Sequence, residues 1–189
     1  PSRESVIADA IQLRGKLEQK ALEEEAVTGN YIRPIVLFQA QPRSNDDNTT
    51  FDKIKHLLLE IGIPEEEIAI KTGEINDLKN VDLLSKACAV RYIITVNALK
   101  EGWDCPFAYI LASLANKTSA VDVEQILGRV LRQPYTRQHQ HFLLNSSYVL
   151  SCSNDFRNTL DSIVKGLNGA GFSRKDYRVG GEEEVPAKE

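Results

Sequence analysis

The sequence predicts an α/β fold, in which a mostly parallel β-sheet is flanked by helices on both faces and preceded by a long N-terminal helix. Short apolar runs, typical of buried parallel strands, alternate with segments whose apolar residues recur every three to four positions, as in amphipathic helices. The length of 189 residues suits one such domain. The 42% hydrophobic and 26% charged residues are ordinary for a globular protein.

The first element is an amphipathic helix over residues 2–27, which Thr28-Gly29-Asn30 is expected to end. We interpret residues 1–30 as a helical arm that lies on the domain or bridges to a neighbour, with a coiled-coil partner as the alternative.

Five strands and several helices follow within a domain expected to span residues 31–172. The predicted strands are Ile35–Phe38, Ile68–Ile70, Tyr92–Val96, Ala108–Ala112 and Ser147–Leu150. The predicted helices are 51–61, capped by Thr49 or Thr50 and ended by Gly62, a short one from Asn80 through Ala87, Ser119–Arg132, and Asn154 to about Leu167. Residues 173–189 have little to bury and are expected to form a flexible linker.

Composition excludes several classes of protein. No apolar run is long enough to span a membrane, and the N-terminus has no secretory-signal pattern. The three widely spaced cysteines fit buried thiols in a reducing cytosol. The net charge of −4 restricts any polyanion contact to a local patch such as Lys117–His141. The absence of Met favours a fragment of a longer protein.

One predicted helix carries the most informative pattern. Gln125, Arg129 and Arg132 share a face opposite its apolar stripe, and Gly128 allows a backbone or ligand to approach closely. Two guanidinium groups a turn apart suit phosphate oxygens. A solvated polar face is the alternative.

The order Gln-x-x-Gly-Arg-x-x-Arg resembles motif VI of superfamily 2 helicases. The resemblance implies that Arg129 and Arg132 are catalytic arginine fingers reaching the γ-phosphate of ATP. It also implies that Gln125 and Gly128 lie at the nucleotide.

The upstream segment Ile94–Pro106 resembles motif V of the same superfamily, with a strand, a short turn and then Gly102-Trp103-Asp104. The resemblance places Gly102 and Asp104 beside the nucleotide. Thr95 and Asn97 are candidate contacts to a DNA phosphate. Many members carry their Thr at the position of Val96, so the match departs there.

Three further segments resemble the restriction (Res) subunit of type III restriction enzymes: 98–109, 125–134 and 144–149. The run Arg33–Gln39 resembles the motif IV strand of that family, which makes Gln39 a candidate DNA contact, and Lys117 in the basic patch is another. The match covers about Tyr31 to Leu150. The fold it implies is that of a second RecA-like domain.

This resemblance implies a cytoplasmic ATP-driven translocase on double-stranded DNA, working in a restriction system with an endonuclease activity and a modification methyltransferase subunit. ATP and Mg²⁺ would be bound mainly by a first RecA-like domain, because this chain contains no P-loop, and the fragment alone is expected to be inactive. The alternatives are another superfamily 2 DNA motor, from repair or a type I restriction system, and a non-catalytic docking module. No metal site is expected, since His139 and His141 are assigned to a solvated loop and His56 to the outer face of its helix.

Overall fold

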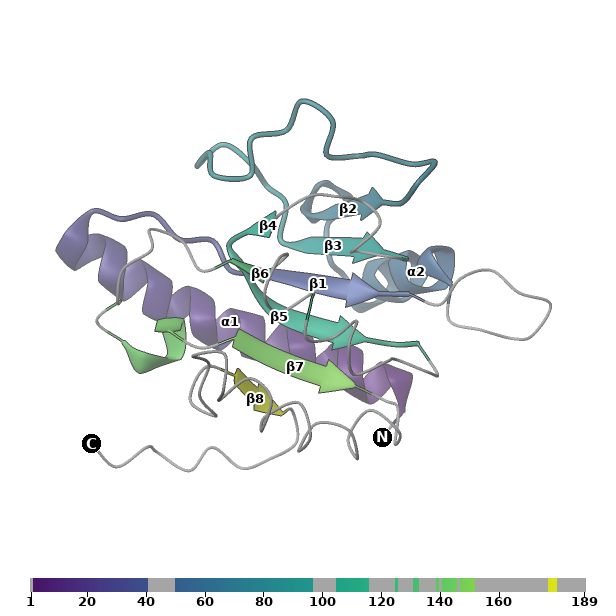
Figure 1. Ribbon diagram of the computed structural model, residues 1–189, viewed down its shortest axis with the longest axis horizontal. Coiled ribbons are helices and arrows are strands. Elements are labelled where there is room, and N and C mark those ends of the chain that lie inside the picture. The colour runs from purple at the N-terminus through teal and green to yellow at the C-terminus, as the bar shows by residue number, and fades with distance from the viewer. Residues whose placement is uncertain are drawn as a thin grey trace.

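The computed structural model describes residues 2–40, 50–96, 105–115, 125, 131–132, 139, 141–145, 147–151 and 177–179. Its centre is a parallel sheet in the order β2-β3-β1-β5-β7-β8 (Figure 1). The strands are β1 (Ile35–Gln39), β2 (Ile68–Lys71), β3 (Tyr92–Thr95), β5 (Ala108–Ser113), β7 (Ser147–Ser151) and β8 (Tyr177–Val179). A separate pair is formed by β4 (Cys105–Pro106) and β6 (Leu131–Arg132). The fold is therefore the predicted α/β, RecA-like one, with all five predicted strands in place.

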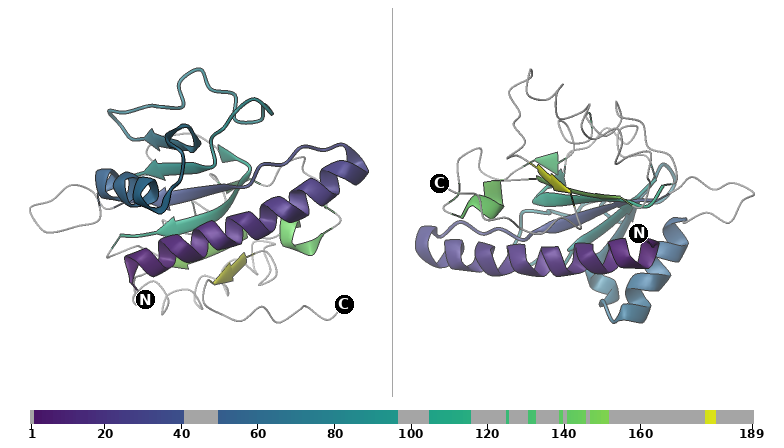
Figure 2. Two further views of the ribbon diagram at one scale, coloured as in Figure 1. Left: turned by 180° about the vertical axis from the view of Figure 1, so that it is seen from behind. Right: turned by 90° about the horizontal axis from the view of Figure 1, so that it is seen from below.

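The N-terminal helix α1 (Arg3–Thr28) also matches its prediction. Ser2 caps it by accepting a hydrogen bond from the Ser5 amide at 3.1 Å, and Gly29 ends it with φ of 77°. One face of α1 is buried in the same core as the strands, through Val6, Ile7, Ala10, Leu17 and Ala21. The helix is thus laid along the sheet (Figure 2).

Helix α2 (Phe51–Ile61) follows β1 and ends at Gly62, as predicted. Seen edge-on, α1 and α2 lie on the same side of the sheet (Figure 2). The two further helices predicted over 119–132 and 154–167 lie almost entirely outside the described residues. Among the described residues, no helix combines the length and apolar composition needed to cross a membrane.

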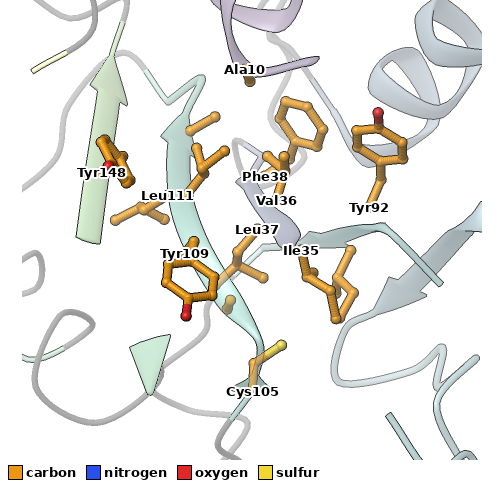
Figure 3. Close-up of a cluster of buried hydrophobic side chains, with 14 of the residues drawn as sticks. Ala10, Ile35, Val36, Leu37, Phe38, Tyr92, Cys105, Tyr109, Leu111 and Tyr148 are labelled. Atoms are coloured by element: carbon orange, nitrogen blue, oxygen red, sulfur yellow. The ribbon is translucent and has the colours of Figure 1, made fainter. Parts of the chain in front are cut away.

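Side chains alternate between the two faces of the sheet, and both faces are buried. Figure 3 shows Phe38 beside Ala10 of α1, with Leu37 and Tyr109 lying away from that helix. All four side chains have no more than 1% of their surface exposed. This explains why the strands read as continuous apolar runs in the sequence.

The helix predicted from Asn80 through Ala87 is wrong. The chain there makes a series of turns, with Asn80 at φ of 62°. The physical reason is that the buried side chain of Arg33 donates hydrogen bonds to the carbonyls of Leu83 and Ser85, and the turns point both carbonyls at the guanidinium.

The segment predicted as a linker, 173–189, contributes a strand. Residues Tyr177–Val179 form β8, which pairs in parallel with β7. The remaining residues of that segment lie outside the described part of the chain. Two shorter 3-10 helices, η1 (Glu65–Glu67) and η3 (Phe142–Asn145), complete the described elements.

Candidate nucleotide and nucleic-acid sites at opposite edges of the sheet

Five neighbouring strands end in a polar residue at the carboxyl edge of the sheet. Register pairs Lys71 with Thr95, Thr95 with Gln39, Gln39 with Ser113, and Ser113 with Ser151. Paired residues of parallel strands project to the same face, here the face away from α1. We call these five residues the carboxyl-edge row.

The centre of the row contains two buried polar side-chain atoms. Among the described residues, Thr95 Oγ1 and Gln39 Oε1 are both buried and have no partner. The backbone beneath them is fixed, because the Ala40 amide donates to the Thr95 carbonyl at 2.7 Å and the Leu114 amide donates to the Gln39 carbonyl at 2.9 Å. A buried polar group left unpaired costs about 1–3 kcal/mol, and such groups in native folds often await a water, ion or ligand.

The topology gives this edge a further property. From β1 the chain crosses through α2 to β2, whereas from β3 it passes to the other side of β1 and enters β5. The order of the strands therefore reverses direction at β1, since the chain continues from β1 toward β2 and from β5 toward β7. The carboxyl ends of β3, β1 and β5 therefore meet at a topological switch point, where open α/β sheets bind ligands.

The two candidate DNA contacts in this row differ in exposure. Gln39 is partly exposed, but Thr95 has 0% of its surface accessible. A direct contact of Thr95 with DNA would therefore require neighbouring segments to move. Asn97 and Lys117, the other two candidates, lie outside the described residues; the chain places Asn97 two residues beyond the end of β3 and Lys117 four beyond the end of β5.

A second candidate site lies at the amino edge of the sheet. There β4 pairs in parallel with β6, so that Cys105 is opposite Leu131 and Pro106 is opposite Arg132 (Figure 1). Since Asp104 directly precedes Cys105 in the sequence, this pairing brings the segment after Gly102-Trp103-Asp104 beside the backbone of Arg132. Strand β5 begins only two residues after β4.

The pairing corrects one prediction. Gln125 is helical, as expected, but the helix predicted to reach Arg132 ends earlier, because Leu131 and Arg132 are in β6. The tertiary partner β4 supplies this stretch with a strand environment that local periodicity does not reveal. Arg132 therefore does not share a helix face with Gln125. Gly102, Asp104, Gly128 and Arg129 lie outside the described residues.

Sequence reasoning misplaced His139. Instead of a solvated loop, the structure places it against α1, where its Nδ1 lies 2.7 Å from Glu24 Oε2 and both side chains are at most 3% exposed. The Asn145 side chain brackets His139 by accepting from its amide at 2.7 Å and donating to its carbonyl at 3.0 Å. The signal in the sequence was the position of Glu24 on the apolar face of α1, because a carboxylate buried there needs a polar partner. His56 is exposed on its helix, as predicted, and pairs with Glu60.

The sequence indicated two other features in part, the carboxyl-edge row and the burial of the cysteines. The carboxyl-edge row was readable as one polar residue at the end of each apolar run, although only Gln39 and Thr95 were singled out. Among the cysteines, Cys105 is buried and Cys88 is partly buried, in agreement with their predicted structural role, while Cys152 lies outside the described residues. In the described part of the chain, no group of three or more His, Cys, Asp or Glu side chains is placed to hold a metal ion.

No protein-family model matches this chain, and none of the curated proteins is significantly similar to it in sequence.

Proposed function

We propose that this chain is the second RecA-like domain of an ATP-dependent DNA translocase of superfamily 2, most similar to the motor of a type III restriction enzyme Res subunit. In this proposal it works in the cytoplasm with a first RecA-like domain, double-stranded DNA and a modification methyltransferase subunit. The observation that carries the proposal is the pairing of β4 with β6. It brings together the ends of two separate segments of the sequence, which resemble motifs V and VI.

The amino edge is the proposed nucleotide side. Arg129 and Arg132 would stabilise negative charge on the transferring phosphoryl group, because hydrogen bonds from guanidinium groups fixed in place become stronger as negative charge develops on the phosphate oxygens. Gln125, Gly128, Gly102 and Asp104 would line the nucleotide. The groups this chain offers there are mostly guanidinium and amide groups, which suit phosphate and sugar oxygens and not Mg²⁺. The metal would be held by the first RecA-like domain.

The carboxyl edge is the proposed DNA side. Gln39 carries this part of the proposal, since it is partly exposed at a switch point of the sheet and its side-chain amide nitrogen can donate to a phosphate oxygen. Asn97 and Lys117 would add donors to the DNA backbone from the segments that follow β3 and β5. Because β1 alone spans five residues, the two edges are separated by roughly 16 Å at ~3.3 Å per residue. The same rigid sheet would thus connect nucleotide binding at its amino edge with DNA binding at its carboxyl edge.

The test is Arg132→Ala in the full-length protein. DNA-stimulated ATP turnover should fall by at least about 10²-fold, as when a group that stabilises developing charge is removed. Arg132→Lys should restore little, because a lysine cannot form the same planar fork. The control is His56→Ala, on an exposed helix face. Near-normal turnover in Arg132→Ala would rule out the arginine-finger role.

A non-catalytic docking module is the second candidate. The observation that favours it is the complete burial of Thr95, which would make the carboxyl-edge row a structural feature. A docking module would leave ATP turnover unchanged in both Arg129→Ala and Arg132→Ala. Another superfamily 2 branch, from repair or type I restriction, would show the same arginine dependence and would be separated by the protein subunits that co-purify with it.

A further inference from the structure

Arg33 is buried beneath the amino edge of the sheet and joins three segments of the chain. Its guanidinium donates to the carbonyls of Val90 at 2.7 Å, Ser85 at 3.0 Å and Leu83 at 2.6 Å, and to the Tyr31 hydroxyl at 3.1 Å. Only 1% of its surface is exposed. It therefore ties the loop before β3 to the residues that lead into β1.

The charge of Arg33 is stabilised by carbonyl oxygens and by aromatic rings. In the part of the chain that the structure describes, no carboxylate lies within ion-pairing distance of it, so its charge is balanced by carbonyl oxygens and by two aromatic rings, those of Tyr31 and Phe107, at 5.8 and 5.7 Å. Burying a cation in this way is costly compared with an apolar side chain of similar volume. A residue that served only to fill space would not need this charge.

Phe107, the second ring, occupies a strained conformation. Its φ of 69° lies in the left-handed region, which a bulky residue rarely adopts. Three contacts hold it there: the Arg33 guanidinium, the Tyr31 ring packed edge-on at a centroid distance of 5.9 Å, and a hydrogen bond from the Ile35 amide to the Phe107 carbonyl at 2.8 Å. Such strain persists only where the surroundings fix it, and it concentrates at functional sites.

The position of Phe107 connects this strain to the amino edge. Phe107 is the single residue between β4 and β5, so its backbone angles set the direction in which β4 leaves the sheet. Strand β4 in turn carries the pairing with Arg132. A path of direct contacts thus leads from Arg33 through Phe107 to β4 and β6.

We propose that Arg33 is a positioning residue for the nucleotide edge: it holds the left-handed turn at Phe107 so that β4 stays paired with β6, the strand that contains Arg132. This inference rests on the proposed function for its consequence in catalysis, but its structural part stands alone. Arg33 does not touch the nucleotide in this proposal.

The structural part is tested in this chain by Arg33→Lys, which keeps the charge and loses the fork of donors. Trp103 is the only tryptophan of the chain and lies two residues before β4, so its fluorescence reports on this segment. We expect a shifted emission maximum, acrylamide quenching raised at least about twofold and faster amide exchange at Phe107–Tyr109, all under conditions where the chain is folded. Unchanged fluorescence and exchange would overturn the proposal.

The matched control is Arg14→Lys. Arg14 is also buried and bonds to the Tyr92 hydroxyl at 3.1 Å and the Pro34 carbonyl at 3.3 Å, but it contacts neither Phe107 nor the loop before β3. A general loss of stability would change Trp103 equally in both variants and would contradict a specific role. Should Arg33→Lys not fold, Phe107→Leu tests the same path, since it removes the ring that Arg33 contacts; an unchanged Trp103 signal in a folded Phe107→Leu would also overturn the proposal.

The catalytic part is tested in the full-length protein. Arg33→Lys should lower kcat for ATP by about tenfold or more while KM changes little, since misplacing a catalytic group by a fraction of an ångström costs this much. The two proposals fail separately. A Trp103 change with normal turnover would retain Arg33 as the support of β4 and reject the nucleotide function of this edge, whereas lost turnover in Arg132→Ala with no Trp103 change in Arg33→Lys would do the reverse.

Discussion

The imidazole Nδ1 of His139 lies 2.7 Å from the Glu24 carboxylate, and this contact joins residues 115 positions apart in the sequence. It fastens the far half of α1 to the connection that leads from β6 to β7. The backbone of the same helical turn is engaged as well, since the Thr28 hydroxyl donates to the Glu24 carbonyl at 2.9 Å.

Removing Glu24 should therefore destabilise the fold. Glu24→Ala is expected to lower the free energy of unfolding by about 1–3 kcal/mol, because it leaves the buried His139 ring without this partner. Urea denaturation followed by circular dichroism measures the effect. Glu23→Ala, which removes an exposed pair with Lys20, should change stability at pH 7 by less than about 0.5 kcal/mol. Equal losses in the two variants would show that the buried contact contributes nothing special.

The nearby His141 predicts a pH dependence. Desolvation on burial lowers the pKa of His141 below 6.5, Lys20 lowers it further, and Glu23 opposes the shift. The Leu143 amide also donates to His141 Nδ1 at 3.2 Å, which requires an unprotonated nitrogen. The unfolded chain binds this proton more readily than the folded chain does. The contribution of the neutral His141 ring to the free energy of unfolding is therefore fully present above pH 6.5, and it is lost as pH falls through the lowered folded pKa.

His141→Gln should accordingly flatten the slope of stability against pH just below pH 6.5. Urea midpoints measured in steps between pH 7 and pH 5 give that slope. His56→Gln, which makes the same substitution at an exposed histidine of α2, is the matched control. A steeper decline in His141→Gln than in the unaltered chain would contradict the assigned direction of the shift.

Helix α1 should behave as part of the core. Leu17 is fully buried, and Leu17→Ala is expected to cost about 2–5 kcal/mol of unfolding free energy through lost burial and a residual cavity. Leu22→Ala on the same helix is the control, because 56% of Leu22 is exposed and its loss should cost less than about 1 kcal/mol. If Leu17→Ala were tolerated as well as Leu22→Ala, α1 would be a detachable arm.

The hydroxyl of Thr95 should contribute little to the stability of the fold. Its buried hydroxyl has no hydrogen-bond partner in the part of the chain that the structure describes, so Thr95→Val, which keeps the shape, is expected to be neutral or stabilising by up to about 1 kcal/mol in thermal unfolding. Ile94→Thr, the reverse change on the opposite face of the same strand, should destabilise by about 1–3 kcal/mol because it buries a new hydroxyl. A marked loss of stability in Thr95→Val would mean that the hydroxyl has a partner.

Gln39 should contribute to DNA binding. Binding of the chain to duplex DNA, followed by fluorescence anisotropy, should weaken in Gln39→Ala and should weaken similarly for unrelated sequences, as contacts to the DNA backbone do. Lys117→Ala should in addition reduce the slope of log affinity against log salt by about one unit. The control Lys55→Ala alters a lysine that pairs with Glu65 away from this edge. Equal binding by all variants would remove the carboxyl edge from the proposed DNA path.

The sequence by itself determined the α/β class and the strands. Apolar runs such as Val36–Phe38 are buried on both faces, so they stand out in any reading of hydrophobicity. The ends of α1 and α2 were also predictable, because Gly29 and Gly62 adopt left-handed backbone angles that favour glycine and stop a helix. These features depend on interactions close along the chain.

Tertiary structure decided what depends on distant partners. Residues 80–87 form turns and not a helix because the carbonyls of Leu83 and Ser85 accept hydrogen bonds from Arg33. Leu131–Arg132 form a strand because they pair with β4. His139 is buried because its ring contacts the buried carboxylate of Glu24 on α1. Local periodicity contains no information on such partners, since each one is brought close by a segment tens of residues away, and the free energy of that contact exceeds the small local preference it overrides.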